Sequence, residues 1–565
     1  MARSTPSRRS KSSDPEMVLV PLGGCGEIGM NLYLYGVGPA KDRKWLMVDI
    51  GIKFGDDRDP GIDIILPDTA FIESKKHALQ GILLTHAHED HFGALAHLWP
   101  RLKAPVYATP FTAYLLRSKL AEAGLEDDVP IHEVGIGDRF AIGEFDVELI
   151  TVTHSIPEPS AVAIRTSVGT VLHSGDWKID PAPVIGDPMA EDKLRALGQE
   201  GCDVLVCDST NVLRDGISPS ESDVAQGLLD VIKTARQRVA VTTFASNAGR
   251  IVSIANAARE CGREVVLVGR AMRRIVEASK ATGYMQDLPD VLDEDEYGYL
   301  PRDKVLCLCT GSQGERRAAL WRIAEGSHPN VTFDDGDMVV FSSRTIPGNE
   351  KSVGYVQNAL SDIGVKIVTA DDAPVHVTGH PRRGELEQMY DWVKPGLVVP
   401  MHGEARHLWE HSRFAKSCGV PASLVVENGD IARLLPGPGA VIDEAPSGTL
   451  HVDGKVIVRS FDGPARIRRK MSFTGVVAVS LVMDGTGELQ SDPGVETLGL
   501  PEVDADGVPL VDVAYNIIED TLDTLPRAKL RSDEIVEEFV RRAVRRALDM
   551  RWGKKPQCLV TVHRI

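Results

Sequence analysis

The sequence lacks the features by which membrane and secreted proteins are recognised. No apolar run in its 565 residues approaches the length needed to cross a bilayer, and the N-terminus has no apolar segment that could act as a signal. Its eight cysteines include no C-x-x-C pair, and this usage fits a reducing compartment. We therefore expect a cytoplasmic protein that does not associate with membranes.

An excess of positive charge is missing too. The formal net charge is −18, from 63 Lys+Arg against 81 Asp+Glu, which argues against a broad basic surface for nucleic acid. Binding depends on local potential, however, so an anionic substrate held in one cleft is still compatible with this charge. Residues 1–13 differ from the rest because they are rich in serine, arginine and lysine, and we expect a disordered basic tail there.

What the sequence does contain is a dense group of metal-ligand side chains. The run Thr85-His86-Ala87-His88-Glu89-Asp90-His91 holds three imidazoles and two carboxylates. It follows the apolar stretch Gly81-Ile82-Leu83-Leu84, so we place it on the loop at the C-terminal end of a buried strand. Such spacing lets several ligands converge on adjacent metal ions. A polar loop that happens to be rich in histidine is the weaker interpretation.

Three further strand ends offer one ligand each. They are His154 after Val152-Thr153, Asp176 after Leu172-His173-Ser174-Gly175, and His402 after Pro400-Met401. The simplest interpretation of each residue by itself is a turn residue with no metal-binding role. Together with the first cluster they give seven ligands, enough for two zinc ions with a bridging carboxylate: His86, His88, Asp90, His91, His154, Asp176 and His402.

One motif is misleading. Gly24-x-Gly26-x-x-Gly29 has the spacing of a dinucleotide-binding loop, which should open a helix. Here it leads into Asn31-Leu32-Tyr33-Leu34-Tyr35, whose alternation is typical of a strand. We reject a nucleotide site.

The order of expected elements predicts an interrupted first domain. Residues 17–210 contain many short strands with a few helices, as in a sandwich of sheets covered by helices. From Ser220 helices and strands alternate regularly, which is typical of a parallel α/β domain. Because ligand-type residues return after this stretch, we interpret it as an insertion. The expected parts are a tail over 1–13, a first domain over 14–215 and 373–455, an inserted domain over 216–372, and a linker with a C-terminal domain over 456–565.

Several of these residues resemble known family motifs. Asp49, the 86–91 cluster, His154, Asp176 and His402 resemble the metal-binding motifs of the metallo-β-lactamase fold. Further motifs are similar to the nucleic-acid-processing β-CASP branch and, within it, to the ribonuclease J family: Cys207-Asp208-Ser209-Thr210-Asn211, His376-Val377-Thr378-Gly379-His380, Gly23–Asn31, Thr310–Glu315 and Ile346–Glu350. The resemblance implies an α/β fold, with a metallo-β-lactamase αββα sandwich, an inserted parallel-sheet β-CASP domain and a small α+β C-terminal domain.

The resemblance also implies roles for the site residues. His86, His88 and His154 would hold one zinc, Asp90, His91 and His402 the other, with Asp176 bridging and manganese as the alternative metal. Asp49 would orient ligand imidazoles, and Asp208 would hold or tune a catalytic histidine. The scissile phosphate would be bound by His376, Val377, Thr378, Gly379 and His380, and His380 would protonate the leaving oxygen.

Two further sites are expected. Ser312, Gln313, Ser343 and Arg344 are donors that suit a pocket for a 5′-phosphate, although plain turns of an α/β domain explain them equally well. By resemblance, Asp63 and Asp453 would bind a structural divalent cation, against the simpler interpretation that both are surface carboxylates.

The implied function is that of a zinc-dependent ribonuclease acting in mRNA decay and rRNA maturation. It would degrade single-stranded RNA from 5′-monophosphate ends in the 5′-to-3′ direction and also cut internally. A homodimer or homotetramer assembled through the C-terminal domain is expected, with other RNA-degradation factors as further partners. Two alternatives stay open. The inserted domain argues against a hydrolase of a small thioester or lactam, and the complete ligand set argues against a non-catalytic RNA-binding scaffold.

Overall fold

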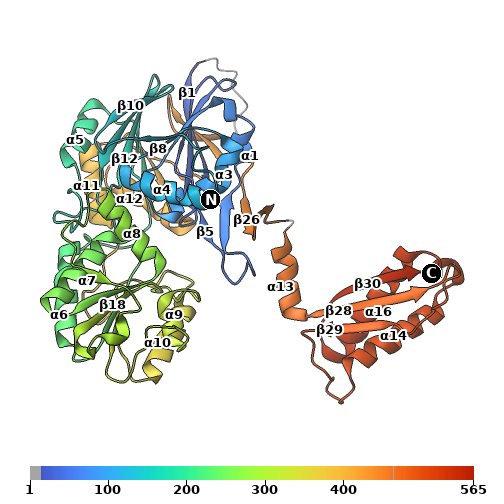
Figure 1. The fold of residues 1–565 in the computed structure, drawn as a ribbon. Helices are drawn as coiled ribbons and strands as arrows, with labels where there is room; N and C mark the ends of the chain where they lie inside the picture. Colours follow the sequence, from blue (N-terminus) through green and yellow to red (C-terminus); the bar gives the residue numbers. More distant parts are fainter. Residues whose placement is uncertain (1–13, 462) are drawn as a thin grey trace. The chain divides into compact units, whose positions relative to one another are not determined.

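The chain forms two structural units, which Figure 1 traces from blue to red. The computed structural model describes residues 14–461 and 463–565, so the expected basic tail over residues 1–13 lies outside the described residues. Unit 1 comprises Met1–Lys53 and Leu66–Gly448, and unit 2 comprises Phe54–Ile65 and Thr449–Ile565. Among the described residues, no helix combines the length and the apolar character needed to cross a membrane.

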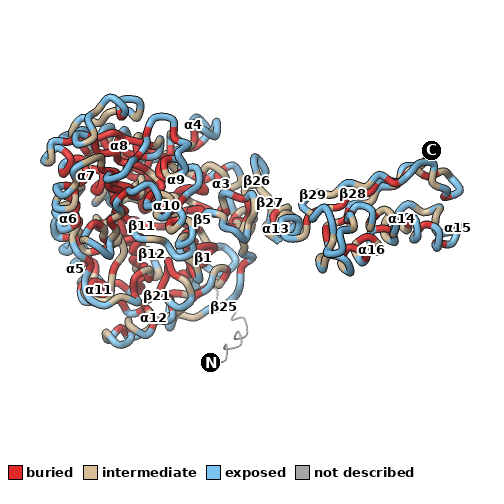
Figure 2. Tube along the Cα trace, turned by 90° about the horizontal axis from the view of Figure 1, so that it is seen from below, coloured by how far each residue is buried: buried red, intermediate tan, exposed pale blue. Residues whose placement is uncertain are grey.

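Two sheets form the inner layers of a sandwich in unit 1. The first has the order β25 (Ala440–Glu444), β24 (Asp430–Leu435), β1 (Glu16–Gly23), β3 (Leu32–Gly38), β4 (Lys44–Val48), β7 (Leu79–Leu83), β8 (Val106–Ala108) and β9 (Ile131–Glu133). The second has the order β10 (Arg139–Ile142), β11 (Phe145–Thr151), β12 (Ser160–Thr166), β13 (Gly169–His173), β14 (Val204–Asp208), β21 (Leu397–Met401) and β23 (Ala422–Ser423). Buried side chains of both sheets, such as Leu46 and Val206, form one core cluster, so the sheets pack face to face. Figure 2 shows the buried residues in red along these strands.

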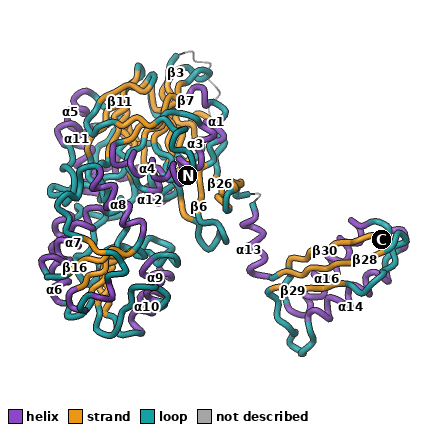
Figure 3. The backbone as a smooth tube through the Cα atoms, in the orientation of Figure 1, coloured by secondary structure: helices purple, strands orange, loops and turns teal. Residues whose placement is uncertain are grey.

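Helices cover the outer faces of the sandwich. On the second sheet, α5 (Glu191–Glu200), α11 (Arg383–Val393) and α12 (Ala405–Ser417) bury residues such as Leu194, Met389 and Ala415 against Leu172 and Leu205. Along the first sheet run α3 (Leu95–Leu102) and α4 (Pro110–Glu122). Figure 3 shows these helices in purple around the orange strands. The αββα arrangement confirms the prediction from the sequence.

The inserted domain contains one parallel sheet. Its order is β17 (Val291–Leu292), β16 (Glu264–Val268), β18 (Val305–Cys309), β15 (Val239–Thr242), β19 (Met338–Phe341) and β20 (Lys366–Val368). The central strands are apolar and buried because helices lie on both faces. These helices are α6 (Glu221–Thr234), α7 (Ala248–Glu260), α8 (Arg270–Ala281), α9 (Ala319–Ala324) and α10 (Glu350–Asp362). The expected parallel sheet is confirmed.

One helix of the inserted domain begins later than its sequence suggests. The apolar pattern predicts a helix from Glu315, whereas α9 begins at Ala319. The Glu315 carboxylate accepts a hydrogen bond from the backbone N–H of Gln313, and Ala318 N donates to Glu315 O. These contacts fix a turn in place of a first helical turn.

Unit 2 combines a C-terminal α+β domain with a small sheet. The sheet order is β27 (Val456–Arg459), β26 (Thr449–Asp453), β6 (Ile64–Pro67) and β5 (Lys53–Phe54), so the distant segment Phe54–Ile65 belongs with this unit. Helix α13 (Pro464–Thr474) leads to the sheet β29 (Gly494–Leu498), β28 (Val476–Met483) and β30 (Gln557–Arg564). Helices α14 (Leu510–Thr524) and α16 (Asp533–Trp552) pack on it through one apolar cluster.

Candidate metal centre

The predicted ligands meet because their strands run parallel. Strands β13, β14 and β21 are parallel neighbours, so their C-terminal ends lie at one edge of the sheet. Asp176 follows β13, Asp208 ends β14 and His402 follows β21. Strands β4 and β7 of the other sheet are also parallel, and they end just before Asp49 and the 86–91 cluster.

These ends form three overlapping groups of ligand atoms. Within each group the atoms lie within 4.8 Å of one another, and Asp176 belongs to all three. The groups are His86, His88, His154 and Asp176; Asp90, His91, Asp176 and His402; and Asp176, Asp208, His380 and His402. The structure therefore brings together all seven ligands expected from the sequence, with Asp208 and His380 beside them.

In the first group the imidazole lone pairs face one another. Thr85 Oγ1 donates to Asp49 and so accepts from His86 Nδ1 at 2.9 Å, while His154 Nδ1 donates to Gly379 O at 2.7 Å. The Nε2 atoms of both histidines are then unprotonated, and each lies 3.1 Å from His88 Nδ1. One proton could satisfy only one of these contacts. Two nitrogens on a tetrahedral zinc lie about 3.3 Å apart, since Zn–N bonds are about 2.0–2.1 Å long.

The second group combines imidazoles with carboxylates. His91 Nδ1 donates to Asp49 Oδ2 at 2.7 Å, which leaves Nε2 facing Asp176 Oδ2 at 3.2 Å. The Nε2 atom of His402 lies 3.3 Å from Asp90 Oδ2 and is buried without a hydrogen-bond partner. Asp49 and His402 both have left-handed backbone conformations, with φ of 61° and 50°. Such strain in non-glycine residues is typical of functional sites.

The electrostatics of the centre fit divalent cations. Burial, together with the charges of nearby imidazoles, lowers the pKa of His86, and burial lowers the pKa of His88 to about 4. Both imidazoles therefore stay neutral, as metal ligands must be. Burial opposes protonation of His91 as well, but the carboxylates of Asp176, Asp90 and Asp49 raise its pKa well above the usual value. Neutral imidazoles beside buried carboxylates make a donor set that suits a divalent cation.

Beside the metal ligands lies a histidine–aspartate pair. His380 Nδ1 is 2.7 Å from Asp208 Oδ2. Burial alone would lower the pKa of His380, but Asp208 and Asp176 raise it above the usual value. His380 is 21% exposed, whereas Asp208 is fully buried. The pair therefore favours the protonated form of an imidazole that is partly exposed beside the ligands.

The other expected phosphate-binding residues lie on the same segment. A Cβ atom on Gly379 would lie 2.6 Å from the His154 ring, so only glycine lets this backbone approach the ligand. Thr378 Oγ1 accepts a hydrogen bond from Asn211. Val377 is buried. Burial and the positive charge of Arg250 lower the pKa of His376 to about 3, so its ring is neutral.

The loops expected to bind a 5′-phosphate are held together by Gln313. Its side-chain amide donates to Arg344 O and accepts from Ile346 N, so this amide braces the loop that carries Arg344. Ser312 and Ser343 are buried and Arg344 is exposed. The pocket itself stays a prediction, with Gln313 as a support of the loop.

The expected structural cation site also stays a prediction. Both carboxylate oxygens of Asp453 accept hydrogen bonds from Arg468, at 3.0 and 2.9 Å. Asp63 accepts a hydrogen bond from Gly55 through its backbone carbonyl. Neither residue belongs to a ligand group found within the described part of the chain.

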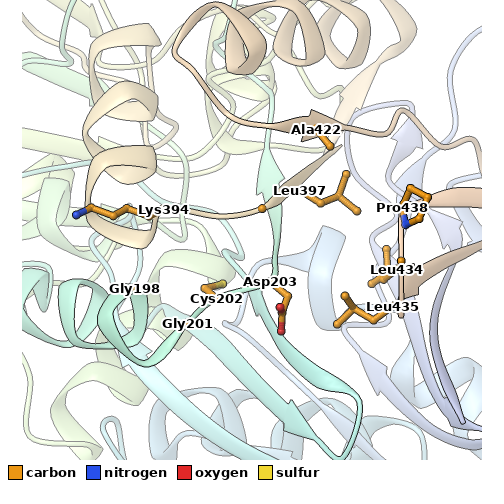
Figure 4. A pocket seen from close by; sticks show the side chains of 13 residues that line it. Gly198, Gly201, Cys202, Asp203, Lys394, Leu397, Ala422, Leu434, Leu435 and Pro438 are labelled. Carbon is orange, nitrogen blue, oxygen red and sulfur yellow. The ribbon is translucent and has the colours of Figure 1, made fainter.

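A cavity of about 330 Å³ lies away from the centre. It is lined by residues at the N-terminal ends of β14 and β21, including Cys202, Asp203 and Leu397 (Figure 4). The ligands lie at the opposite ends of the same strands, so this cavity is separate from the metal centre.

Sequence reasoning missed the partners that fix the ligand tautomers. Thr85 and Gly379 O hold His86 and His154, and Asn31 contacts His91. Thr85 begins the histidine cluster and Asn31 ends the glycine-rich motif, so proximity to a motif was the only available signal. The backbone contact of Gly379 has no signal in a single sequence.

Comparisons with known proteins agree with this architecture. Four family profiles match the chain: "Beta-lactamase superfamily domain" over residues 58–243, "Ribonuclease J, beta-CASP domain" over 236–360, "Zn-dependent metallo-hydrolase RNA specificity domain" over 371–423, and "Ribonuclease J C-terminal domain" over 466–565. Ribonuclease J of Sinorhizobium meliloti is 49% identical over 554 residues, which cover 98% of this chain and 98% of that protein. The chain belongs to the ribonuclease J family.

Other members of the ribonuclease J family are more distant. The protein of Thermus thermophilus is 34% identical over 96% of this chain and 94% of its own length, and that of Corynebacterium glutamicum is 35% identical over 96% and 75%. A crystal structure of a protein of unknown function from Enterococcus faecalis V583 matches with a TM-score of 0.50 at 15% identity, covering 74% of this chain and 99% of that one; it shows likeness of fold alone. Membership of the ribonuclease J family makes this chain a metal-dependent ribonuclease.

Proposed function

We propose that the centre holds two zinc ions, with manganese as the alternative, and cleaves RNA both from 5′-monophosphate ends and internally. His86, His88 and His154 would bind one ion and Asp90, His91 and His402 the other, with Asp176 bridging. The observation that carries the proposal is the membership of Asp176 in all three groups of ligand atoms. A carboxylate in this position can serve two cations and lie beside the acid that completes the reaction.

Each residue near the ligands has a separate task in this proposal. When bound, the metal ions supply a nucleophile from water and stabilise the charge that develops on the scissile phosphate. His380 protonates the departing 3′ oxygen, because Asp208 accepts from Nδ1 and leaves Nε2 to face the substrate. Asp49 fixes the orientation of His91. His376, Val377, Thr378 and Gly379 line the path of the scissile phosphate.

Positive charge near the centre supports an RNA substrate. Burial lowers the pKa of Arg214, and so do the charges of Arg344 and Arg382, so these three guanidinium groups lie within electrostatic range of one another. Arg344 follows β19 of the inserted sheet, and Arg214 and Arg382 lie close in sequence to Asp208 and His380, so an RNA strand bound at the centre would meet these cations. Such a cluster binds backbone phosphates in spite of the acidic net charge.

The finer parts of the function rest on the family. We propose that Ser312, Ser343 and Arg344 bind the terminal 5′-phosphate, that Asp63 and Asp453 hold a structural divalent cation, and that the chain forms a homodimer or homotetramer through residues 456–565. Leu498 and Leu559 of the C-terminal sheet are 73% and 65% exposed, which supports a subunit contact there. Roles in mRNA decay and rRNA maturation, with other degradation factors as partners, complete the proposal.

A substrate comparison tests the proposal. We expect 5′-monophosphate RNA to be degraded to mononucleotides much faster than the same RNA with a 5′-triphosphate, because a small pocket excludes the larger group. Internal cleavage of a circular RNA measures the endonuclease separately. Equal exonuclease rates on both ends would contradict the pocket assignment. Hydrolysis of a lactam or a thioester with no action on RNA would contradict the proposed function as a whole.

A further inference from the structure

The glycine-rich segment Gly23–Asn31 is not used by the proposed chemistry, yet it contacts the second group of ligands on both sides. Strand β2 (Cys25–Gly26) pairs in parallel with β22 (Gly403–Glu404), the strand that directly follows His402. At its other end the segment reaches Asn31, which is fully buried. The segment therefore lies between Asp90, which comes early in the sandwich domain, and His402, which comes late.

Asn31 is bonded to both early ligands of this group. Its backbone N donates to Asp90 O at 2.8 Å, and its side-chain Nδ2 donates to the same carbonyl at 3.1 Å. Nδ2 also lies 3.0 Å from His91 Nε2 and 3.5 Å from Asp90 Oδ2. The carbonyl and the carboxylate of Asp90 can only accept hydrogen bonds, so the side chain must present its NH₂ group to them.

Tyr33 fixes this orientation from the other side. Its hydroxyl donates to Asn31 Oδ1 at 2.8 Å, and the backbone of His402 lies close enough to the hydroxyl to oppose the rise in its pKa that burial causes. A Cβ atom on Gly24 would lie 2.1 Å from the Tyr33 hydroxyl and 2.4 Å from Asn31 Oδ1. The glycine thus leaves room for the hydrogen bond between them, which explains a motif whose spacing resembles a dinucleotide loop.

We propose that Asn31 is a positioning residue for the second metal ion, and that Tyr33 locks it in place. The pair bonds Asp90, holds the Asn31 amide against the His91 ring, and reaches the backbone of His402. Partners of this kind fix the direction of metal ligands, and their loss typically weakens metal affinity about 10–100-fold. This inference rests on the proposed two-ion centre.

Zinc binding to the full-length protein tests the inference without using RNA. The metal-free protein is titrated with zinc against a chromophoric chelator, and the bound cobalt(II) spectrum is recorded in parallel. We expect two tight equivalents in the wild type. In Asn31→Ala we expect one tight equivalent, a second weakened about 10–100-fold, and an altered cobalt spectrum.

Two tyrosines on the same strand provide a matched pair. Tyr33 and Tyr35 are both buried, and the Tyr35 hydroxyl bonds His173, which is outside the ligand groups of the described chain. Tyr33→Phe should weaken the second zinc, whereas Tyr35→Phe should bind both ions as the wild type does. These two tyrosine variants test the positioning role even if Asn31→Ala fails to fold.

The possible outcomes distinguish failure of the positioning role of Asn31 from failure of the proposed two-ion centre. A wild type that binds fewer than two zinc ions would contradict both. Two tight equivalents in the wild type, with unchanged affinities in Asn31→Ala or with equal effects of the two tyrosine variants, would overturn the positioning role alone.

Discussion

At the scale of single residues, the centre depends on groups that fix where each proton sits. Thr85, Gly379 O and Asp49 each accept from one histidine Nδ1, so that the Nε2 atoms of His86, His154 and His91 are free to bind a cation. His380 is held by Nδ1 in the same way, but its side chain is partly exposed whereas the side chains of those three histidines are buried. The same kind of contact thus makes ligands of some histidines and an acid of another.

His380→Gln tests the role of that acid. We expect the rate of RNA cleavage to fall about 10²–10⁴-fold while the metal content is unchanged, because only protonation of the leaving oxygen is lost. A phosphodiester with a p-nitrophenolate leaving group needs no proton, so the loss on that substrate should be much smaller. Equal losses on both substrates would show that His380 has another role.

A buried histidine outside the centre gives a pH dependence of stability. His411 lies between Ser209 and Tyr390, and burial lowers its pKa from 6.5 to about 4. The folded state therefore resists a proton that the unfolded state accepts. Stability should fall as the pH drops from 6.5 towards 4, by about 3 kcal/mol from this group.

Urea unfolding of the wild type and of His411→Gln across this pH range isolates the effect. All other groups titrate in both proteins, so the wild type should lose more stability than the variant as the pH falls. Parallel curves would contradict the assignment.

At the scale of elements, the inserted domain is organised around a buried ion pair. Helices α6 and α7 are joined by Glu221 and Arg250, which are nearly inaccessible and bonded at 2.9 Å. Arg250 also donates to Ser342 and to Val375 O, just before the phosphate-binding segment. The pair therefore fixes both helices relative to the end of β19 and to the segment that leads into the centre.

Arg250→Ala should destabilise the protein by about 3–5 kcal/mol, because it leaves the buried Glu221 carboxylate without a partner. The same two helices carry an exposed pair, Lys233 and Glu260, at 2.9 Å. Lys233→Ala is the matched control, and little change is expected there because surface pairs contribute little. Similar urea midpoints for the two variants would show that the buried pair does not hold the helices.

At the scale of the whole molecule, the fold was largely predictable from the sequence. Apolar runs that end in ligand residues predicted the strands of the sandwich. The regular alternation of helices and strands after Ser220 predicted the inserted parallel sheet. The assignment of Phe54–Ile65 to unit 2 could not be predicted, because nothing local marks pairing with strands beyond residue 448. The domain boundaries drawn from the sequence stay a proposal.

The site residues that form sequence motifs could be predicted. The contacts that depend on how the backbone folds could not. The seven expected ligands converge, and so do His380 and Asp208. The contacts of Gly379 O and Asn31 depend on the fold as a whole. Gln313 was expected to donate a hydrogen bond to a phosphate because its side chain carries an amide. The structure shows that this side-chain amide is bonded to the backbone of Arg344 and Ile346.

The central claim is that the converged side chains hold the metal on which RNA cleavage depends. The most direct measurement is the metal content of the purified protein and of His86→Ala, taken together with hydrolysis of 5′-monophosphate RNA before and after chelation. We predict two divalent ions per wild-type chain, loss of hydrolysis on chelation with recovery on added zinc or manganese, and an inactive variant with reduced metal content. A metal-free wild type that hydrolyses RNA at its full rate would contradict the account.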